Sequence, residues 1–336
     1  MSQCKACVQP VRRSRLAWSA GLAWLLLLSL LAAGPAALAQ AQVVALVPKS
    51  LDNPFFSDVE KGAVAAAREL GVELQFVGPP THDIAGQIAI IEALIESGVD
   101  ALAVSPTDAA SISPLIRRAL NAGIPVITFD SDALPGTGRI AFVGTNNYAG
   151  GVAAGEAFIR ALSRGKYAIL TGGLGAANLN ARIDGFRDVL AKFPGAYEEI
   201  PGSPFPSDDD IQRAVQIVED LITAHPDLDA IYMAGGWAQF APEAYTQALG
   251  HRVNDVKTET RDGSLVIVSF DVLEPQVQLI RNGLTTANVS QRPYEIGYQT
   301  VHVLYRLANG ETLEQEFYDT GVVVVTETNL DEFLQQ

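Results

Sequence analysis

The sequence predicts an α/β protein built from two doubly wound parallel-sheet domains. From residue 43 onward, short β-branched apolar runs alternate with amphipathic stretches of helical period, and the alternation restarts in the second half of the chain. Such alternation is typical of a parallel sheet covered by helices on both faces. Two of the apolar runs, Val126–Phe129 and Val268–Phe270, are each followed by aspartate, which indicates a weak internal repeat.

The first domain begins with a strand at Val43–Val47 and a helix at Pro54–Leu70. Asn53 is a suitable N-cap for this helix, Pro54 suits its first position, and Gly71 ends it. The pattern continues with strands at Val72–Val77, Ala101–Val104 and Pro125–Phe129 and helices at Ile84–Ser97 and Ala109–Ala122.

The second domain repeats the pattern, with a loop at Ser203–Asp210 whose acidic residues suit the start of the next helix. Ligands of open α/β sheets bind outside the carboxyl ends of the strands. If the two domains face each other, Asp130 and Asp271 therefore point into one cleft. The predicted strands are Tyr167–Leu170, Asp229–Met233 and Leu265–Phe270, and the predicted helices are Asn178–Phe193, Asp210–Ala224 and Glu274–Asn282.

Residues 1–39 have the three-part layout of a secretory signal peptide. A basic segment precedes an apolar core, and Ala37-Leu38-Ala39 forms a small-residue exit before Gln40. The apolar length would also permit a membrane anchor, but the exit and the soluble pattern beyond it favour cleavage. Both cysteines lie in this leader. We therefore expect export to the periplasm or another extracytoplasmic compartment, and a mature chain that needs no disulfide.

The mature chain is strongly acidic. Four of the 23 basic residues lie in the leader, so 19 remain against 38 acidic residues, a net charge near −19. Such a charge repels nucleic acid, which excludes a nucleic-acid partner. About 297 residues suit two domains with ordinary cores. The four histidines lack ligand spacing, so we expect neither a metal nor any other cofactor.

The stretch Asp52-Asn53-Pro54-Phe55-Phe56 places two aromatic rings where an α/β protein often has a glycine-rich phosphate loop. Adjacent helical residues diverge by about 100°, so the two rings cannot share one face. Phe56 belongs with the apolar face of the predicted helix, which leaves Phe55 near the mouth of the sheet. Phe55 is either a shielded surface ring or a platform for the C–H face of a sugar, and Phe56 remains a further candidate.

Asp130 and Asp271 allow three interpretations. They are a general acid and base, as in a glycoside hydrolase, or fixed acceptors for ligand hydroxyls, or caps of the following helices. Nothing else in the sequence supplies what a hydrolase needs. Binding is therefore favoured over catalysis, no catalytic residue is assigned, and an exported glycosidase-like enzyme using Asp130 and Asp271 is the alternative.

A glycine-rich turn, Thr171–Asn178, follows one predicted strand and opens a helix. It resembles a dinucleotide-binding turn, but Asn178 occupies the third glycine position. The turn is better interpreted as bringing Asn178, Asn180 and Arg182 to the cleft. Trp237 follows Gly235-Gly236 at another strand end, where it is either a core residue or a second ring for a ligand.

These residues together resemble the periplasmic sugar-binding proteins of ABC transporters, of the ribose/galactose-binding type. The resemblance runs from Val43 to about Val325. The segments that carry it are Asp52–Phe56, Ile124–Asp130, Arg182–Phe186, Thr223–Asp227, Ser269–Asp271 and Gln291–Pro293.

The resemblance implies a type I periplasmic binding protein-like fold, with a hinge of three crossings near Gly144–Asn146, Gln291–Arg292 and Tyr318–Thr320. The first domain then comprises residues 42–145 plus 292–318, and the second 146–291 plus 319–336. The candidate ligand-binding residues are Asn53, Phe55, Phe56, Asp130, Asn180, Arg182, Trp237, Asp271 and Gln291.

By the same resemblance, the chain is not an enzyme. It is a monomeric receptor that closes on a monosaccharide or polyol and delivers it to a membrane permease of an ABC transporter, with a chemoreceptor as a further candidate partner. Ribose binders carry arginine where this chain has Ser131 and Asn180, and asparagine where Gly235-Gly236 stands. A pocket aromatic of that family aligns near Asp209, and Trp237 is its candidate replacement. We therefore expect a ligand other than ribose.

Overall fold

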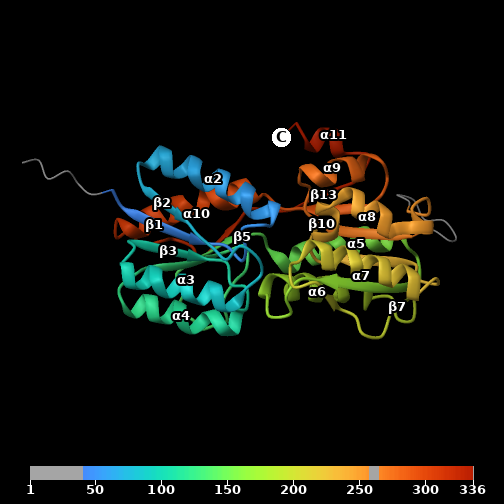
Figure 1. Cartoon of the computed structure of the whole chain (residues 1–336), viewed down its shortest axis with the longest axis horizontal. Helices are drawn as coiled ribbons and strands as arrows, with labels where there is room; N and C mark the ends of the chain where they lie inside the picture. Colours follow the sequence, from blue (N-terminus) through green and yellow to red (C-terminus); the bar gives the residue numbers. More distant parts are fainter. Residues whose placement is uncertain (1–40, 257–264, 336) are drawn as a thin grey trace, which may run out of the picture. The chain divides into compact units, whose positions relative to one another are not determined.

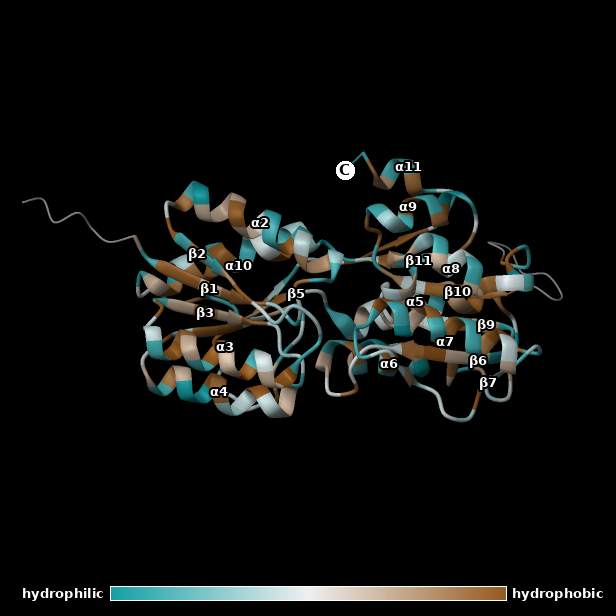
Figure 2. Ribbon diagram, viewed as in Figure 1, coloured by the Kyte–Doolittle hydropathy of each residue, from teal (hydrophilic) through white to brown (hydrophobic). Residues whose placement is uncertain are grey.

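The computed structural model describes residues 41–256 and 265–335, which form two α/β domains (Figure 1). The predicted signal peptide, residues 1–39, lies outside the described residues. Each domain has a central sheet with helices on both faces, which confirms the predicted fold class. In Figure 2 the strands are the most hydrophobic segments, and the buried apolar residues cluster between the sheets and the helices.

The first sheet is entirely parallel, in the order β12-β5-β4-β3-β1-β2. The order reverses direction at β1, so the neighbouring carboxyl ends of β1 and β3 lie where a doubly wound sheet binds its ligand. Its strands are β1 (Val43–Val47), β2 (Glu73–Phe76), β3 (Ala101–Val104), β4 (Val126–Phe129), β5 (Phe142–Gly144) and β12 (Phe317–Asp319).

The second sheet repeats this arrangement in the order β13-β11-β10-β9-β6-β7, with β8 paired to β6. All of these pairs are parallel except that of β13 with β11. The strands are β6 (Gly165–Thr171), β7 (Tyr197–Glu199), β8 (Phe205–Pro206), β9 (Ala230–Met233), β10 (Val266–Phe270), β11 (Ala287–Ser290) and β13 (Val323–Val325).

In the first domain, α2 and α10 cover one face of the sheet and α3 and α4 the other (Figure 1). The start of α2 is fixed as the sequence predicts: Asn53 Oδ1 accepts a hydrogen bond from the Phe55 amide at 3.0 Å, and Gly71 caps the other end at φ 69°. The helices of this domain are α2 (Pro54–Leu70), α3 (Ile84–Ser97), α4 (Ala109–Asn121) and α10 (Pro293–Ala308).

In the second domain, α5 packs on α6 through glycines that let the two backbones approach. A Cβ on Gly151 would lie 2.0 Å from the Arg182 carbonyl oxygen, and one on Gly185 would lie 2.2 Å from that of Tyr148. The elements are α5 (Asn147–Ala161), α6 (Ala177–Leu190), α7 (Ile211–Ala224), the 3₁₀ turns η1 (Trp237–Phe240) and η2 (Gly250–Arg252), α8 (Pro242–Leu249), α9 (Glu274–Arg281) and α11 (Leu330–Phe333).

The chain passes between the two sheets three times. It crosses from β5 to α5, returns from β11 to α10, and crosses again from β12 to β13. The three-crossing hinge implied by the resemblance is therefore present. Among the described helices, none is both long and apolar enough to cross a membrane.

Candidate functional site

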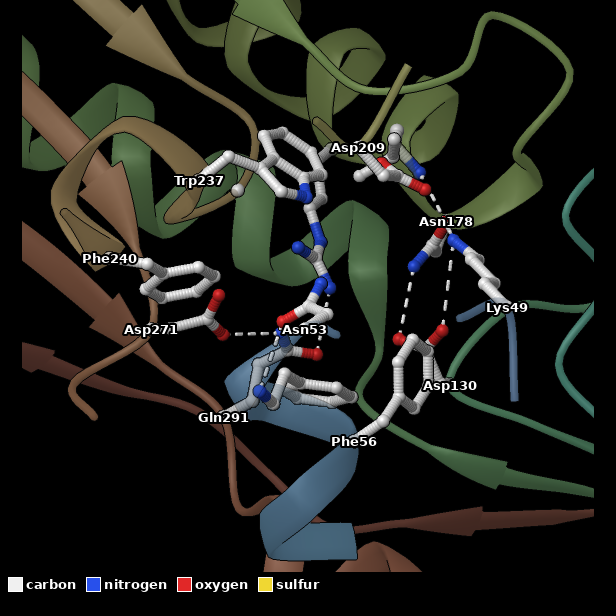
Figure 3. A pocket seen from close by; sticks show the side chains of 14 residues that line it. Lys49, Asn53, Phe56, Asp130, Asn178, Asp209, Trp237, Phe240, Asp271 and Gln291 are labelled. Carbon is white, nitrogen blue, oxygen red and sulfur yellow. Dashed lines mark hydrogen bonds and ion pairs between the residues drawn. The ribbon is translucent and has the colours of Figure 1, made fainter. Parts of the chain in front are cut away.

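A pocket lies where the carboxyl ends of both sheets meet (Figure 3). About 340 Å³ of space, which includes open solvent, lies among the residues that line it. The lining side chains come from both domains and combine carboxylates, amides, two cations and aromatic rings. This composition suits a small ligand that has both polar groups and an apolar face.

The two strand-end aspartates predicted to face one cleft both line this pocket. Asp130 follows β4 and Asp271 follows β10, and each is at most 5% exposed. Both have left-handed backbone conformations, with φ of 57° and 70°. Such values are uncommon outside glycine, and aspartate is among the residues that tolerate them. The two sheets therefore place the same acidic group by the same local backbone turn.

The carboxylate of Asp130 is held by protein groups. Its Oδ2 accepts from Ser105 Oγ at 2.6 Å and lies 3.7 Å from Lys49 Nζ, while its Oδ1 accepts from Asn178 Nδ2 at 3.1 Å. Lys49 also donates to Asn178 Oδ1 at 2.9 Å. Since Lys49 and Asp130 belong to the first domain and Asn178 to the second, this buried cluster joins the domains directly (Figure 3).

Asp271 has one side-chain partner on its carboxylate, in addition to a backbone hydrogen bond from Gly236. Gln291 Nε2 donates to its Oδ1 at 2.7 Å. Burial raises the pKa of Asp271, while Arg182 and the hydrogen bond from Gln291 act in the opposite direction. A buried carboxylate with spare acceptor capacity is a strong site for hydroxyl donors.

Arg182 organises the second domain's side of the pocket. Its guanidinium donates to Asn147 Oδ1 at 2.8 Å, to the Ala234 carbonyl at 2.9 Å and to Gln291 Oε1 at 2.7 Å, and it lies 4.2 Å from the centre of the Phe270 ring. Burial lowers its pKa, and the charge of Asp271 is the main opposing influence. These contacts use most of its donors on the protein, so Arg182 fixes the positions of residues around the pocket.

Four aromatic rings line the pocket, and all are buried. Phe55 and Phe56 meet edge-to-face at 5.3 Å between ring centres, and Phe56 also packs edge-on against Phe129 at 6.4 Å. Neither Phe55 nor Phe56 is exposed at the mouth of the sheet. Trp237 and Phe240, both from η1, supply rings from the second domain.

Most of the predicted site residues come together here. Asn53, Phe55, Phe56, Asp130, Arg182, Trp237, Asp271 and Gln291 all line the pocket. Asn180 does not: its side chain is exposed and donates to the Leu174 carbonyl at 3.0 Å. Residues two apart on a helix lie about 200° apart, so Asn178 and Arg182 face the pocket together while Asn180 faces away.

Sequence reasoning missed three lining residues, Lys49, Leu179 and Phe240. It assigned Asp209 to an acidic helix start and to the position of a pocket aromatic in the resembled family, but not to the pocket itself. Lys49 follows β1, where a lone lysine resembles a solvated surface residue. Phe240 lies one 3₁₀ turn after Trp237, and the Gly235-Gly236 pair was the only signal for that turn. Among the described residues, no group of three or more His, Cys, Asp or Glu side chains is placed to hold a metal ion.

The fold and the pocket define a two-domain receptor that binds a small ligand between parallel sheets. Residues 44–312 match the family described as periplasmic binding protein domain. The chain therefore belongs to the periplasmic binding protein family, which confirms the resemblance found in the sequence. The ribose import binding protein RbsB of Salmonella typhimurium is 27% identical over 275 residues, which cover 82% of this chain and 87% of that protein.

Solved structures show the same fold. An ABC transporter solute-binding protein from Burkholderia graminis, in complex with D-arabinose, is 35% identical with a TM-score of 0.76, over 86% of this chain and 96% of that one. A solute-binding protein from Agrobacterium vitis with bound D-fucose is 28% identical with a TM-score of 0.79, over 86% and 97%.

Proposed function

We propose that the chain is an exported solute-binding protein that captures a monosaccharide or related polyol in this pocket and delivers it to the permease of an ABC transporter. The observation that carries the proposal is the pair of buried aspartates, one from each sheet, that line one pocket together with aromatic rings. Carbohydrates combine many O–H donors with apolar C–H faces. Ionised carboxylates accept from the donors, and aromatic rings pack against the faces.

The candidate contacts divide between the domains. From the first domain we propose Asn53, Phe55, Phe56 and Asp130. Asn53 uses its oxygen to cap α2, which leaves its amide N–H groups for a ligand. From the second domain and the hinge we propose Trp237, Asp271 and Gln291, with Arg182 as the residue that positions them. The bound D-arabinose and D-fucose of the related structures support a sugar as the ligand.

The mechanism is capture by hinge closure, as in other periplasmic binding proteins. A ligand that contacts both domains does so only in the closed state, so binding shifts the population toward closure. The boundaries that we propose for the moving parts are residues 42–145 plus 292–318 and residues 146–291 plus 319–336. The permease then distinguishes the closed form from the open one.

The proposal includes binding without turnover, a monomeric receptor and a periplasmic or extracytoplasmic location after removal of residues 1–39. A chemoreceptor remains a further candidate partner. The comparisons lend no support to the glycosidase alternative, since the related proteins are import or solute-binding proteins.

Isothermal titration of the purified protein against pentoses, hexoses and polyols tests the proposal. We expect saturable one-to-one binding of at least one of them, and recovery of the sugar unchanged after incubation. Mass spectrometry of ligand carried through purification would narrow the panel. Binding to none of the sugars would refute the proposal, and release of product from aryl glycosides that Asp130→Asn abolishes would establish the enzyme instead.

A further inference from the structure

Three consecutive aspartates, Asp208, Asp209 and Asp210, lie between β8 and α7, and they have different environments. Asp210 caps α7 by accepting from the Arg213 amide at 2.6 Å, and Asp208 is half-buried and pairs with the Arg213 guanidinium. Asp209 is only 7% exposed and lines the pocket. The two outer aspartates therefore have local structural roles that the middle one lacks.

The backbone turns Asp209 inward. Asp208 and Asp209 have positive φ values, 53° and 60°, which are uncommon for residues other than glycine. Gly172 leaves room for the side chain, since a Cβ there would lie 1.9 Å from Asp209 Oδ1 and 2.8 Å from the Trp237 ring. The carboxylate therefore lies beside the indole at one end of the pocket (Figure 3).

The two oxygens of Asp209 have different partners. Oδ2 lies 3.4 Å from Nδ1 of His82, which belongs to the loop between β2 and α3 of the first domain. Oδ1 is buried and has no hydrogen-bond partner among the residues that the structure describes. Buried polar atoms almost always have a partner, and one without a partner pays its desolvation cost uncompensated. The pocket therefore offers an acceptor whose donor must come from outside the protein.

We propose that Asp209 is a specificity-determining residue: its Oδ1 accepts a hydrogen bond from a ligand hydroxyl beside Trp237, while its Oδ2 contacts His82 of the opposite domain. The inference rests on the proposed function, because it takes the ligand to be a sugar or polyol. The preferred ligand then carries a hydroxyl at the Trp237 end of the pocket, in addition to those that reach Asp130 and Asp271. A deoxy analogue that lacks this hydroxyl is rejected.

A hydroxyl suits this position better than an ammonium group. Cationic character is already present in this pocket, from the His82 ring at Asp209 Oδ2 when protonated and from Lys49 beside Asp130. A site that is built to bond a hydroxyl discriminates strongly against a ligand without it, because the acceptor is then left buried and unpaired. The same carboxylate thus links recognition of one hydroxyl to contact between the two domains.

Trp237 provides the signal for the test. The chain contains three tryptophans, and Trp18 and Trp24 precede residue 41, so Trp237 is the sole tryptophan of the compact unit Ala41–Gln336. Fluorescence titration of this unit therefore reports on the end of the pocket that Asp209 occupies. The best-binding sugar is titrated beside each of its mono-deoxy analogues and its amino analogues.

The proteins to compare are the unmodified chain, Asp209→Ala, Asp209→Asn and the adjacent control Asp208→Asn. We expect both Asp209 variants to weaken sugar binding by roughly tenfold or more, and the control by less than about twofold. One deoxy analogue should bind the unmodified chain roughly tenfold or more weakly than the parent sugar does. The same analogue and the parent sugar should bind Asp209→Ala with nearly equal affinity. Thermal unfolding without ligand checks that each variant is folded, and Asp209→Asn keeps the side-chain shape.

The possible outcomes distinguish a failure of the Asp209 inference from a failure of the proposed sugar-binding function. Suppose that the unmodified chain binds sugars, but that every deoxy analogue loses the same factor in affinity, relative to the parent sugar, in Asp209→Ala as in the unmodified chain. The inference is then wrong and the proposed function stands. If an amino analogue binds more tightly than the parent sugar, the assignment of a hydroxyl is wrong. If the unmodified chain binds no sugar or polyol, the proposed function and this inference fail together.

Discussion

Asp130 and Asp271 end equivalent strands of the two sheets in the same backbone conformation, but their surroundings differ. The carboxylate of Asp130 is bonded to Ser105 and Asn178 and lies near Lys49, so much of its capacity is used within the protein. That of Asp271 is bonded to Gln291 and to the Gly236 backbone, and no cation lies within ion-pair distance of it among the described residues. The same strand-end aspartate is therefore used differently in the two sheets: Asp130 helps to join the domains, and Asp271 keeps acceptor capacity that the proposed function assigns to ligand hydroxyls.

Each aspartate also has a buried cation near it, Lys49 for Asp130 and Arg182 for Asp271. One cation bonds across the two domains and the other bonds within its own domain. Arg182 belongs to the framework of its own domain, through three hydrogen bonds and the Phe270 ring. Lys49 reaches across to Asn178 of the opposite domain. Removal of Arg182 should therefore affect folding, whereas removal of Lys49 should affect closure.

The largest expected effect is that of Arg182→Met. It leaves three buried acceptors unpaired and Asp271 without its nearby cation, so we expect a loss of about 3–5 kcal/mol of unfolding free energy, or roughly 10 °C in Tm.

Lys49→Met should lower Tm by less than half as much and weaken sugar binding by about tenfold, since it removes the hydrogen bond that the charged lysine donates across the domains to Asn178. Calorimetry and titration measure the two quantities.

Matched controls exist for both cations. Arg187→Met changes a partly exposed arginine on the same helix as Arg182, paired with Glu199, and Lys61→Met changes an exposed lysine paired with Asp58. Exposed ion pairs contribute about 1 kcal/mol or less, so both controls should leave binding unchanged. If Lys49→Met lowers Tm as much as Arg182→Met does, it is wrong that Arg182 mainly stabilises the fold of its own domain while Lys49 mainly stabilises the contact between the domains.

The second-largest expected effect is the difference between Asp271→Asn and Asp130→Asn in sugar affinity and ligand-free Tm. Asp271→Asn should weaken sugar binding by about 100-fold, because charged hydrogen bonds contribute about 1.5–3 kcal/mol each. It should lower ligand-free Tm by less than Asp130→Asn does, since Arg182 keeps its three hydrogen bonds to the protein. Asp130→Asn should weaken binding too, but it should also lower ligand-free Tm by roughly 5 °C, since three protein groups lose their charged partner. Equal changes in Tm for the two variants would remove the distinction.

The sequence could predict these aspartates because parallel sheets bring the carboxyl ends of their strands to one edge, whatever the loops do. The periodic pattern could not place the Asp209 side chain in the pocket, because an inward turn through left-handed backbone leaves no periodic signal in an acidic run; only the resemblance to a known family pointed near this position. The sequence could not show that Asn180 would fail to line the pocket, because one helix start offers several polar residues and their orientation depends on the residue at which α6 begins. Lys49 was missed because its partner, Asn178, lies in the other domain.

The smallest expected effect is a pH dependence from His82. Its hydrogen bond with Asp209 and the charges of Asp209 and Asp208 raise the pKa of His82 above its ordinary 6.5, against burial and the charge of Lys49. Opening the domains removes Asp209, so the protonated ring favours the closed, ligand-binding form. Sugar affinity should be highest below pH 6.5 and fall a few-fold as pH rises through the raised pKa. Titrations from pH 5.5 to 8.5 measure this fall, and His82→Gln should flatten it; an unchanged profile in the variant would assign the pH dependence to another group.

The most direct test of a two-domain sugar receptor is a crystal structure with the sugar that titration selects. We predict that the sugar lies in the pocket of Figure 3, with hydroxyls within hydrogen-bond distance of both Asp130 and Asp271 and one face against an aromatic ring. A sugar that contacts the carboxylate of only one domain, or that binds outside this pocket, would contradict the account.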